Sequence, residues 1–313
     1  MGLLCAALSV AAAQTPKDAL APAIAALQNG EADKALSMLN SLPTSAESRN
    51  LKCRVFFILE HWDEATNECE QAVRLDGQNA VFHLWLGRAL GEKADNASFM
   101  SAYSLAKRTR AEFEEAVRLD PRNAEAMADL GEFYTSAPGV VGGGTDKAER
   151  LITPMEKVDA ARAHQLRARI AESRKDFATA EQEFKQSIAT GEHPSFQWMT
   201  LASFYRKHER WTDMEAAVQS GYKAAQRDKH AGVALYNGAS VLSRGKRNLG
   251  FASKMLEEYL TNYSKTEEAP AFEAHTRLAR LKAALGDIPG ARQERAAALQ
   301  LAHDYKPALA LKF

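Results

Sequence analysis

The side chains that could act in catalysis or bind a metal are spread singly along the chain. None of the eight histidines has a second histidine, a cysteine or a carboxylate at the spacing that metal sites use. They are His61, His83, His164, His193, His208, His230, His275 and His303. The serines lack a nucleophile elbow, and the carboxylates follow helix faces as partners of Lys and Arg. The sequence therefore predicts no catalytic constellation, no metal site and no cofactor, and we expect a protein that is not an enzyme.

A glycine-rich stretch around residues 137–145 is the one segment that suggests phosphate binding. Pro138 and four glycines precede Thr145-Asp146-Lys147. A phosphate-binding loop needs Gly-Lys-Ser/Thr after a strand, whereas here Gly144 is followed by Thr145 and the preceding segment is helical. We instead expect Thr145 or Asp146 to cap an ordinary helix.

Arginine is the polar residue with a repeated position. Four arginines directly follow a small residue of a predicted helix, and two more lie one turn further along theirs. In chain order the set is Arg54, Arg88, Arg169, Arg206, Arg244 and Arg280. Arginine binds carboxylates in a bidentate manner, so a row of free guanidinium groups would favour an acidic ligand. The alternative is that each arginine pairs with an acidic residue of a neighbouring helix.

These side chains must be positioned by a repeated unit of two short helices. Trp198, Leu201, Ala202 and Tyr205 form a Trp-x-x-Leu-small-x-x-Tyr pattern, and weaker copies recur along the chain. Each second helix has an anchor residue, usually small, and these anchors define eight units with a period near 34 residues. The anchors are Ala35, Ala65, Thr109, Ala148, Ala180, Met214, Ala252 and Ala291.

The first helix of a unit carries a small residue between large apolar ones. Gly87, Gly131, Ala202 and Ala279 hold this position, and we expect them to be buried at helix contacts, where only a small side chain permits close approach. Units end in similar turns at residues 74–79 and 118–123, where Pro or Gly stops one helix and Asn caps the next.

Over residues 16–305 this pattern resembles the tetratricopeptide repeat family. The resemblance implies an all-α solenoid of about eight antiparallel helix pairs in a right-handed superhelix, whose first helices line a concave groove. The six arginines would then face the groove and bind an acidic protein or peptide partner. The Lys and Asn pattern of the carboxylate-clamp domains that hold chaperone tails is absent. Residues 134–148 are similar to a subset of exported bacterial members, some of which accompany solute transporters, so a ligand-binding accessory of a transport system is the alternative.

The length of the chain fits a single elongated repeat domain over residues 14–313, and its charge bears on the class of partner. Forty basic and forty acidic residues leave no net charge, which argues against nucleic acid as a partner. No apolar run reaches the roughly 18 residues of a membrane span.

Insertions near residues 92–102 and 137–145 interrupt the repeats. We expect lengthened or bent helices at the first insertion, with Phe99 and Tyr103 buried, where Phe99–Leu105 could plug the groove.

The amino terminus resembles an export signal. Residues 1–13 contain an apolar run that ends in Ala11-Ala12-Ala13, as a cleavage site does, although the basic start is missing. Either the true start lies upstream or this run is the first helix of the solenoid. We expect a periplasmic or secreted protein that begins near Gln14. Cys53 and Cys69 then remain, either as a disulfide or as two buried thiols.

Overall fold

The computed structural model describes residues 17–313, which form eight antiparallel helix pairs followed by a short terminal helix. The pairs are α1 (Lys17–Gln28) with α2 (Ala32–Asn40), α3 (Ala46–Ile58) with α4 (Trp62–Leu75), α5 (Ala80–Asp95) with α6 (Phe99–Leu119), α7 (Ala124–Ser136) with α8 (Thr145–Glu156), α9 (Ala160–Ser173) with α10 (Phe177–Thr190), α11 (Pro194–Lys207) with α12 (Trp211–Ala225), α13 (Gly232–Arg244) with α14 (Leu249–Asn262), and α15 (Ala271–Ala284) with α16 (Ile288–Leu301). A 3₁₀ turn, η1 (Gly139–Val141), precedes α8, and α17 (Lys306–Leu309) ends the fold. The predicted all-α solenoid is confirmed.

The eight predicted anchors all lie in the second helix of a pair, and all are buried. Seven of them are fully buried and Thr109 is 4% exposed. Each anchor sits where the second helix meets its neighbours, so a small side chain or a flexible methionine is what the space admits.

The small residues of the first helices mark close helix contacts, as predicted. A Cβ atom on Gly87 would lie 2.5 Å from the ring of Phe113, and one on Gly131 would lie 2.8 Å from a methyl group of Leu166. Ala202 and Ala279 are fully buried. The turns also follow the sequence, because Asn79 caps α5 and Asn123 caps α7 through their side chains.

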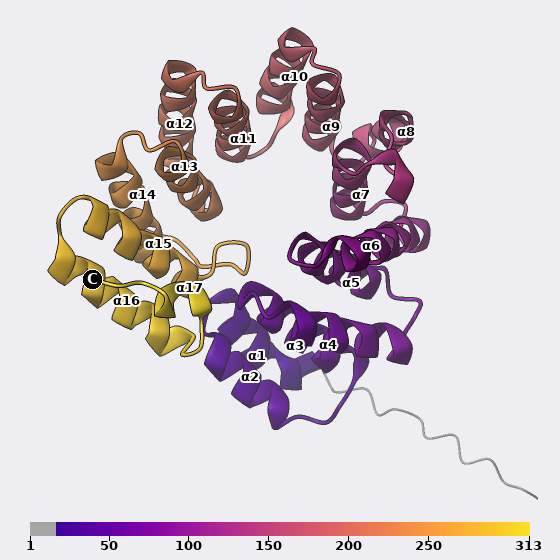
Figure 1. The fold of residues 1–313 in the computed structure, drawn as a ribbon, viewed down its shortest axis with the longest axis horizontal. Coiled ribbons are helices and arrows are strands. Elements are labelled where there is room, and N and C mark those ends of the chain that lie inside the picture. Colours follow the sequence, from indigo (N-terminus) through magenta and orange to yellow (C-terminus); the bar gives the residue numbers. More distant parts are fainter. Residues whose placement is uncertain (1–16) are drawn as a thin grey trace, which may run out of the picture.

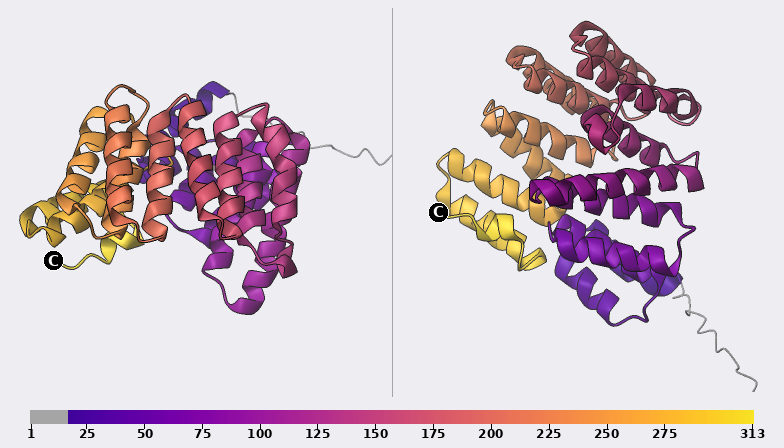
Figure 2. Two further views of the ribbon diagram at one scale, coloured as in Figure 1. Left: turned by 90° about the horizontal axis from the view of Figure 1, so that it is seen from above. Right: turned by 45° about the vertical axis from the view of Figure 1, so that its right-hand side comes forward.

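The first insertion lengthens both helices of the third pair. α5 has 16 residues and α6 has 21, and the long α6 stands out in the right-hand view of Figure 2. The expected burial of its first turn is wrong: Phe99 is 88% exposed, Met100 82% and Tyr103 40%. This end of the hairpin extends past the neighbouring repeats, so no helix of the described residues covers it, and it does not plug the groove.

The second insertion forms η1 and a glycine turn. Gly144 is the N-cap of α8, with no side-chain cap, and Thr145 and Asp146 already belong to the helix. The expected side-chain cap is therefore wrong. The turn needs glycine for another reason: Gly142 and Gly144 have positive φ, and a Cβ atom on Gly143 would lie 1.8 Å from the carbonyl oxygen of Ala137.

Cys53 on α3 and Cys69 on α4 form a disulfide within the second repeat, with a Cα–Cα distance of 5.2 Å. Of the two alternatives left by the sequence, the structure contains the bridge. The predicted signal segment, residues 1–13, lies outside the described residues. No described helix has the length and apolar character needed to cross a membrane.

The solenoid closes on itself into a ring (Figure 1). Leu20 and Leu27 of the first repeat share an apolar cluster with Phe272 and Tyr305 of the last. The Tyr305 hydroxyl also donates a hydrogen bond to Glu60 at 3.1 Å. The loop of residues 263–270, between α14 and α15, projects into the central hollow of this ring (Figure 1). The groove of the superhelix is therefore enclosed around its whole circumference by the repeats.

Candidate functional site

The first helices of the repeats face the central hollow and most second helices lie outside them, whereas α6 also borders the hollow (Figure 1). The odd-numbered helices α9, α11, α13 and α15 form one wall, and α3, α5 and α7 form the opposite wall. The two walls differ in the charge of the cavities that they line.

The first wall contains what we call the basic cavity, a space of about 300 Å³. No carboxylate is among the described residues that line it, whereas four guanidinium groups are, those of Arg169, Arg206, Arg244 and Arg277. Three of these four belong to the arginine set predicted from the sequence. They come from four successive first helices, so stacking of the repeats brings side chains of neighbouring units into one space.

Two of these arginines have no carboxylate partner among residues 17–313. The Nε atom of Arg206 is buried and has no acceptor among the described residues, and the Arg244 side chain makes no hydrogen bond or ion pair with them. Arg169 lies 3.7 Å from Glu132, at the outer limit of an ion pair. A buried N–H group without an acceptor is costly, so the cavity favours a ligand that supplies acceptor oxygens.

Arg277 was not predicted, and its charge is already compensated. It binds Glu273 on its own helix and donates to the Ser240 hydroxyl, and its guanidinium lies over the ring of Tyr236 at 4.5 Å. The sequence pattern pointed to Arg280 instead, which is three residues further along α15. Arg277 lies one turn before Arg280 on the same face of α15, and this spacing was the sequence signal that could have identified it.

Arg280 lines an adjoining cavity of about 370 Å³ together with Arg244. Its guanidinium is exposed and donates only to the carbonyl oxygen of Pro307, at 3.3 Å. This second cavity also contains Glu60 and Glu273, so its charge is mixed. Arg244 and Arg277 line both cavities and connect them.

Arg54 and Arg88 do not join the other predicted arginines. Arg54 binds Glu267 of the projecting loop, with Nη2–Oε2 at 2.7 Å, and Arg88 binds Glu125 and Asp129, both at 2.6 Å. Both guanidinium groups also flank the ring of Trp85, at 5.2 and 4.8 Å. A single basic row over all six arginines is thus not what the structure contains. For Arg54 and Arg88 the alternative from the sequence, pairing with neighbouring carboxylates, describes the structure.

The opposite wall contains a larger space of about 850 Å³, which we call the acidic cavity. Arg88 is its one basic residue among the described lining residues, against seven carboxylates: Glu92, Asp95, Glu125, Asp129, Glu132, Glu267 and Glu268. Aromatic side chains form its apolar part, and they are Phe57, Trp85, Phe113 and Phe133. This cavity has no signature in the sequence, because its residues come from four helices and a distant loop.

Three of these carboxylates have a raised pKa. Burial raises the pKa of Asp129 above its usual range, even beside Arg88. Partial desolvation raises the pKa of Glu92 and of Glu268, and repulsion by other carboxylates adds to it, from Asp95 and Glu60 at Glu92 and from Glu125 at Glu268. The ionised cavity is therefore short of positive charge.

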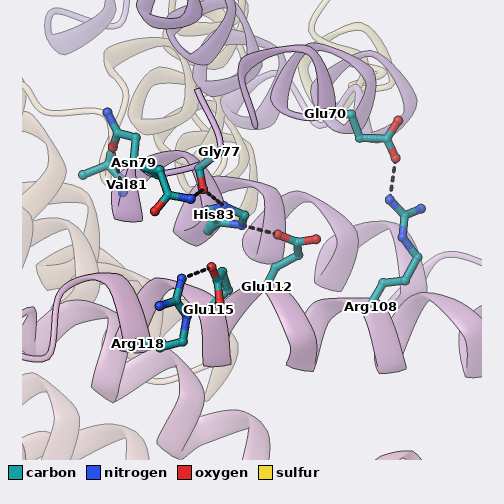
Figure 3. A network of polar contacts seen from close by, with 10 residues as sticks. Glu70, Gly77, Asn79, Val81, His83, Arg108, Glu112, Glu115 and Arg118 are labelled. Atoms are coloured by element: carbon teal, nitrogen blue, oxygen red, sulfur yellow. Dashed lines mark hydrogen bonds and ion pairs between the residues drawn. The ribbon is translucent and has the colours of Figure 1, made fainter. Parts of the chain in front are cut away.

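The histidines serve mainly as hydrogen-bonding partners between helices. His83 is buried on α5, with Nδ1 at 2.6 Å from Glu112 and Nε2 at 3.1 Å from the carbonyl oxygen of Gly77 (Figure 3). Both acceptors are satisfied only if both ring nitrogens carry a proton, and the bond to Glu112 is the main cause that raises the pKa of His83.

Ring closure brings together one group that sequence spacing did not reveal. Asp33 of α2 lies beside His303 and Asp304, and one ligand atom of each lies within 4.8 Å of the others. His303 donates to Asp33 through its backbone N–H at 2.9 Å, and its Nδ1 lies 2.8 Å from the same carboxylate. These contacts connect the first repeat to the last, which accounts for the group.

Comparison with known proteins adds little beyond this geometry. No family model matches the chain, and no curated protein does. Among solved structures, the chain is similar to TTC0263, a thermophilic TPR protein in Thermus thermophilus, with 16% identity and a TM-score of 0.47 over 56% of this chain and 91% of that one. It is also similar to the APC/C hetero-tetramer Cut9-Hcn1, with 12% identity and a TM-score of 0.41, over 93% of this chain and about half (54%) of that one.

Proposed function

We propose that the protein is a non-catalytic scaffold that binds a protein or peptide partner in its central hollow, with an acidic segment of the partner in the basic cavity. The observation that carries this proposal is the set of guanidinium groups of Arg169, Arg206 and Arg244 in a cavity without a carboxylate among its described lining residues. Guanidinium groups that face one space, with no carboxylate lining it to neutralise their charge, favour a carboxylate-bearing ligand.

The shape of the site supports a polymer over a small molecule. The alternative from the sequence, a transport accessory, would be favoured by a closed apolar pocket plugged by Phe99–Leu105. Phe99 and Met100 are exposed at the far end of the hairpin instead. The basic cavity also adjoins further cavities along the wall, because Arg244 lines two of them. A chain of several residues fills such a row of sites better than one small molecule does.

Binding of a labelled acidic peptide, rich in Asp and Glu, tests this function by fluorescence anisotropy. We expect the double charge reversal Arg169→Glu with Arg206→Glu to weaken binding about tenfold or more and to reduce its salt dependence. The matched control is Arg122→Glu with Arg227→Glu, two exposed arginines that line neither cavity. Equal affinities of the two double variants would refute the proposal, as would failure of the unaltered protein to bind at low salt.

We further propose that the chain is exported. A disulfide persists in oxidising compartments, so the bridge between Cys53 and Cys69 supports a periplasmic or secreted location. Mass spectrometry of the protein from its native source should find a mature chain that begins near Gln14. An intact amino terminus in a cytosolic fraction would contradict export.

A further inference from the structure

The acidic cavity is a second site on the concave surface, and the function proposed above does not use it. Its aromatic residues Phe57, Trp85, Phe113 and Phe133 come from α3, α5, α6 and α7. A space of about 850 Å³ with such a lining has room for one large side chain and its neighbour.

The charge of this cavity is only partly compensated from within the protein. Arg88 is already bound by Glu125 and Asp129, and Glu267 is bound by Arg54. Three further carboxylates make no ion pair with a described residue, and they are Glu92, Asp95 and Glu268. An occupant that complements the cavity must therefore carry positive charge next to an apolar group.

A continuous surface connects this cavity to the basic one. An intermediate cavity of about 630 Å³ shares Thr200 and Asn237 with the basic cavity. It shares Glu268, at the tip of the projecting loop, with the acidic cavity. One extended ligand on this surface would meet guanidinium groups at one end and carboxylates at the other.

We propose that the acidic cavity binds a lysine or arginine side chain, next to an aromatic or aliphatic residue, of the same polypeptide whose acidic segment occupies the basic cavity. This inference rests on the proposed function. The cationic head meets Glu92 and Glu268, while the methylene stem and the apolar neighbour cover the aromatic lining. The two opposite charges fix the direction in which the partner lies across the ring, because the reversed chain would place like charges together.

Two labelled peptides test this proposal by anisotropy against the full chain. The first joins an acidic block to Lys-Phe-Lys through a Gly-Ser linker, and the second replaces both lysines by norleucine. We expect the lysine peptide to bind about tenfold more tightly, since two partly exposed charge contacts are of that order. The double variant Glu92→Gln with Glu268→Gln should abolish the difference between the peptides. The control Glu64→Gln with Glu209→Gln, on exposed carboxylates that line neither cavity, should keep it.

The outcomes separate this inference from the proposed function. If both peptides bind equally to the unaltered protein, the acidic cavity does not bind a basic side chain. The same holds if the difference in affinity between the peptides survives in Glu92→Gln with Glu268→Gln. If the norleucine peptide does not bind at all, or ignores Arg169→Glu with Arg206→Glu, the proposed function fails. Competition by phenethylamine at the affinity of the whole peptide would show that the cavity takes a small organic cation, which would overturn the polypeptide assignment.

Discussion

His83 and Glu112 form a polar contact between the two helices of their repeat, and the same contact recurs around the ring. In three other repeats a cationic or imidazole side chain of the first helix meets a glutamate 19 residues later; in the third repeat the separation is 29. The recurring pairs are Arg49 with Glu68, His164 with Glu183, and His275 with Glu294. The added ten residues correspond to the insertion that lengthens α5 and α6.

The first prediction concerns the pH dependence of the His83 contact. The pKa of His83 is raised above 6.5 in the folded protein, so its stabilising effect is complete below pH 6.5 and is lost as the pH rises through the folded pKa. Replacing His83 by Gln should cost about 1–3 kcal/mol of unfolding free energy near pH 6 and less near pH 9. Urea unfolding at both pH values measures this, with His230→Gln, an exposed histidine, as control. A cost that does not change with pH would contradict the assignment.

The second prediction tests the helix contact at Gly131. A leucine there would collide with Leu166 of the next repeat, and we expect a loss of about 1–3 kcal/mol. The matched substitution is Gly250→Leu, because Gly250 also lies in a helix but a Cβ atom added to it would meet nothing within 4 Å. Thermal unfolding of the two variants should differ clearly, and equal melting temperatures would show that the contact yields without cost.

The third prediction concerns the disulfide. Cys53 and Cys69 are 16 residues apart, and closing a loop of that length stabilises a fold by about 3 kcal/mol in the chain-entropy treatment. Replacing both cysteines by alanine, or adding a reductant to the unaltered protein, should lower the free energy of unfolding by about 3 kcal/mol. Urea unfolding measures this loss as a lower midpoint. Thiol titration of the native protein checks the premise, since two reactive thiols at these positions would rule out the bridge.

The fourth prediction is a gain in stability at the acidic cavity. The raised pKa of Glu92 and of Glu268 means that the folded protein disfavours their ionised forms relative to the unfolded chain. Glu92→Gln with Glu268→Gln should therefore melt at a higher temperature than the unaltered protein at pH 7–8. The difference should vanish below the ordinary carboxyl pKa of 4.5, where both glutamates are protonated in either state. A lower melting temperature at neutral pH would show that these carboxylates are paired.

Features set by contacts between adjacent helices could be predicted from the sequence. Ala35 and Ala252 hold the same place in their repeats because a larger side chain would not fit there, and such a constraint leaves a visible period. The burial predicted for Phe99 failed, because apolar character alone does not supply a neighbour that covers it.

Features set by distant contacts could not be predicted. Arg54 and Glu267 are 213 residues apart, and no period connects a first helix to a loop that comes beside it only when the ring closes. The pairing of Arg54 therefore depended on ring closure, which arises from small rotations accumulated over all eight repeats. The sequence pattern grouped Arg169, Arg206 and Arg244, which line one cavity in the structure. It also included Arg54, whose partner Glu267 lies across the closure, and Arg88, whose partners lie on the first helix of the next repeat.

The closure at Tyr305 also changes how the molecule is held together. In a linear array the two end units have one neighbour each, so unfolding starts there and moves inward. Here Leu27 and Phe272 give the first and last repeats a second neighbour, and neither end is a preferred starting point. Unfolding of any one repeat must break two interfaces, so the ring should resist stepwise unfolding from its ends. A long partner must enter through the open faces of the ring or by separating the first repeat from the last.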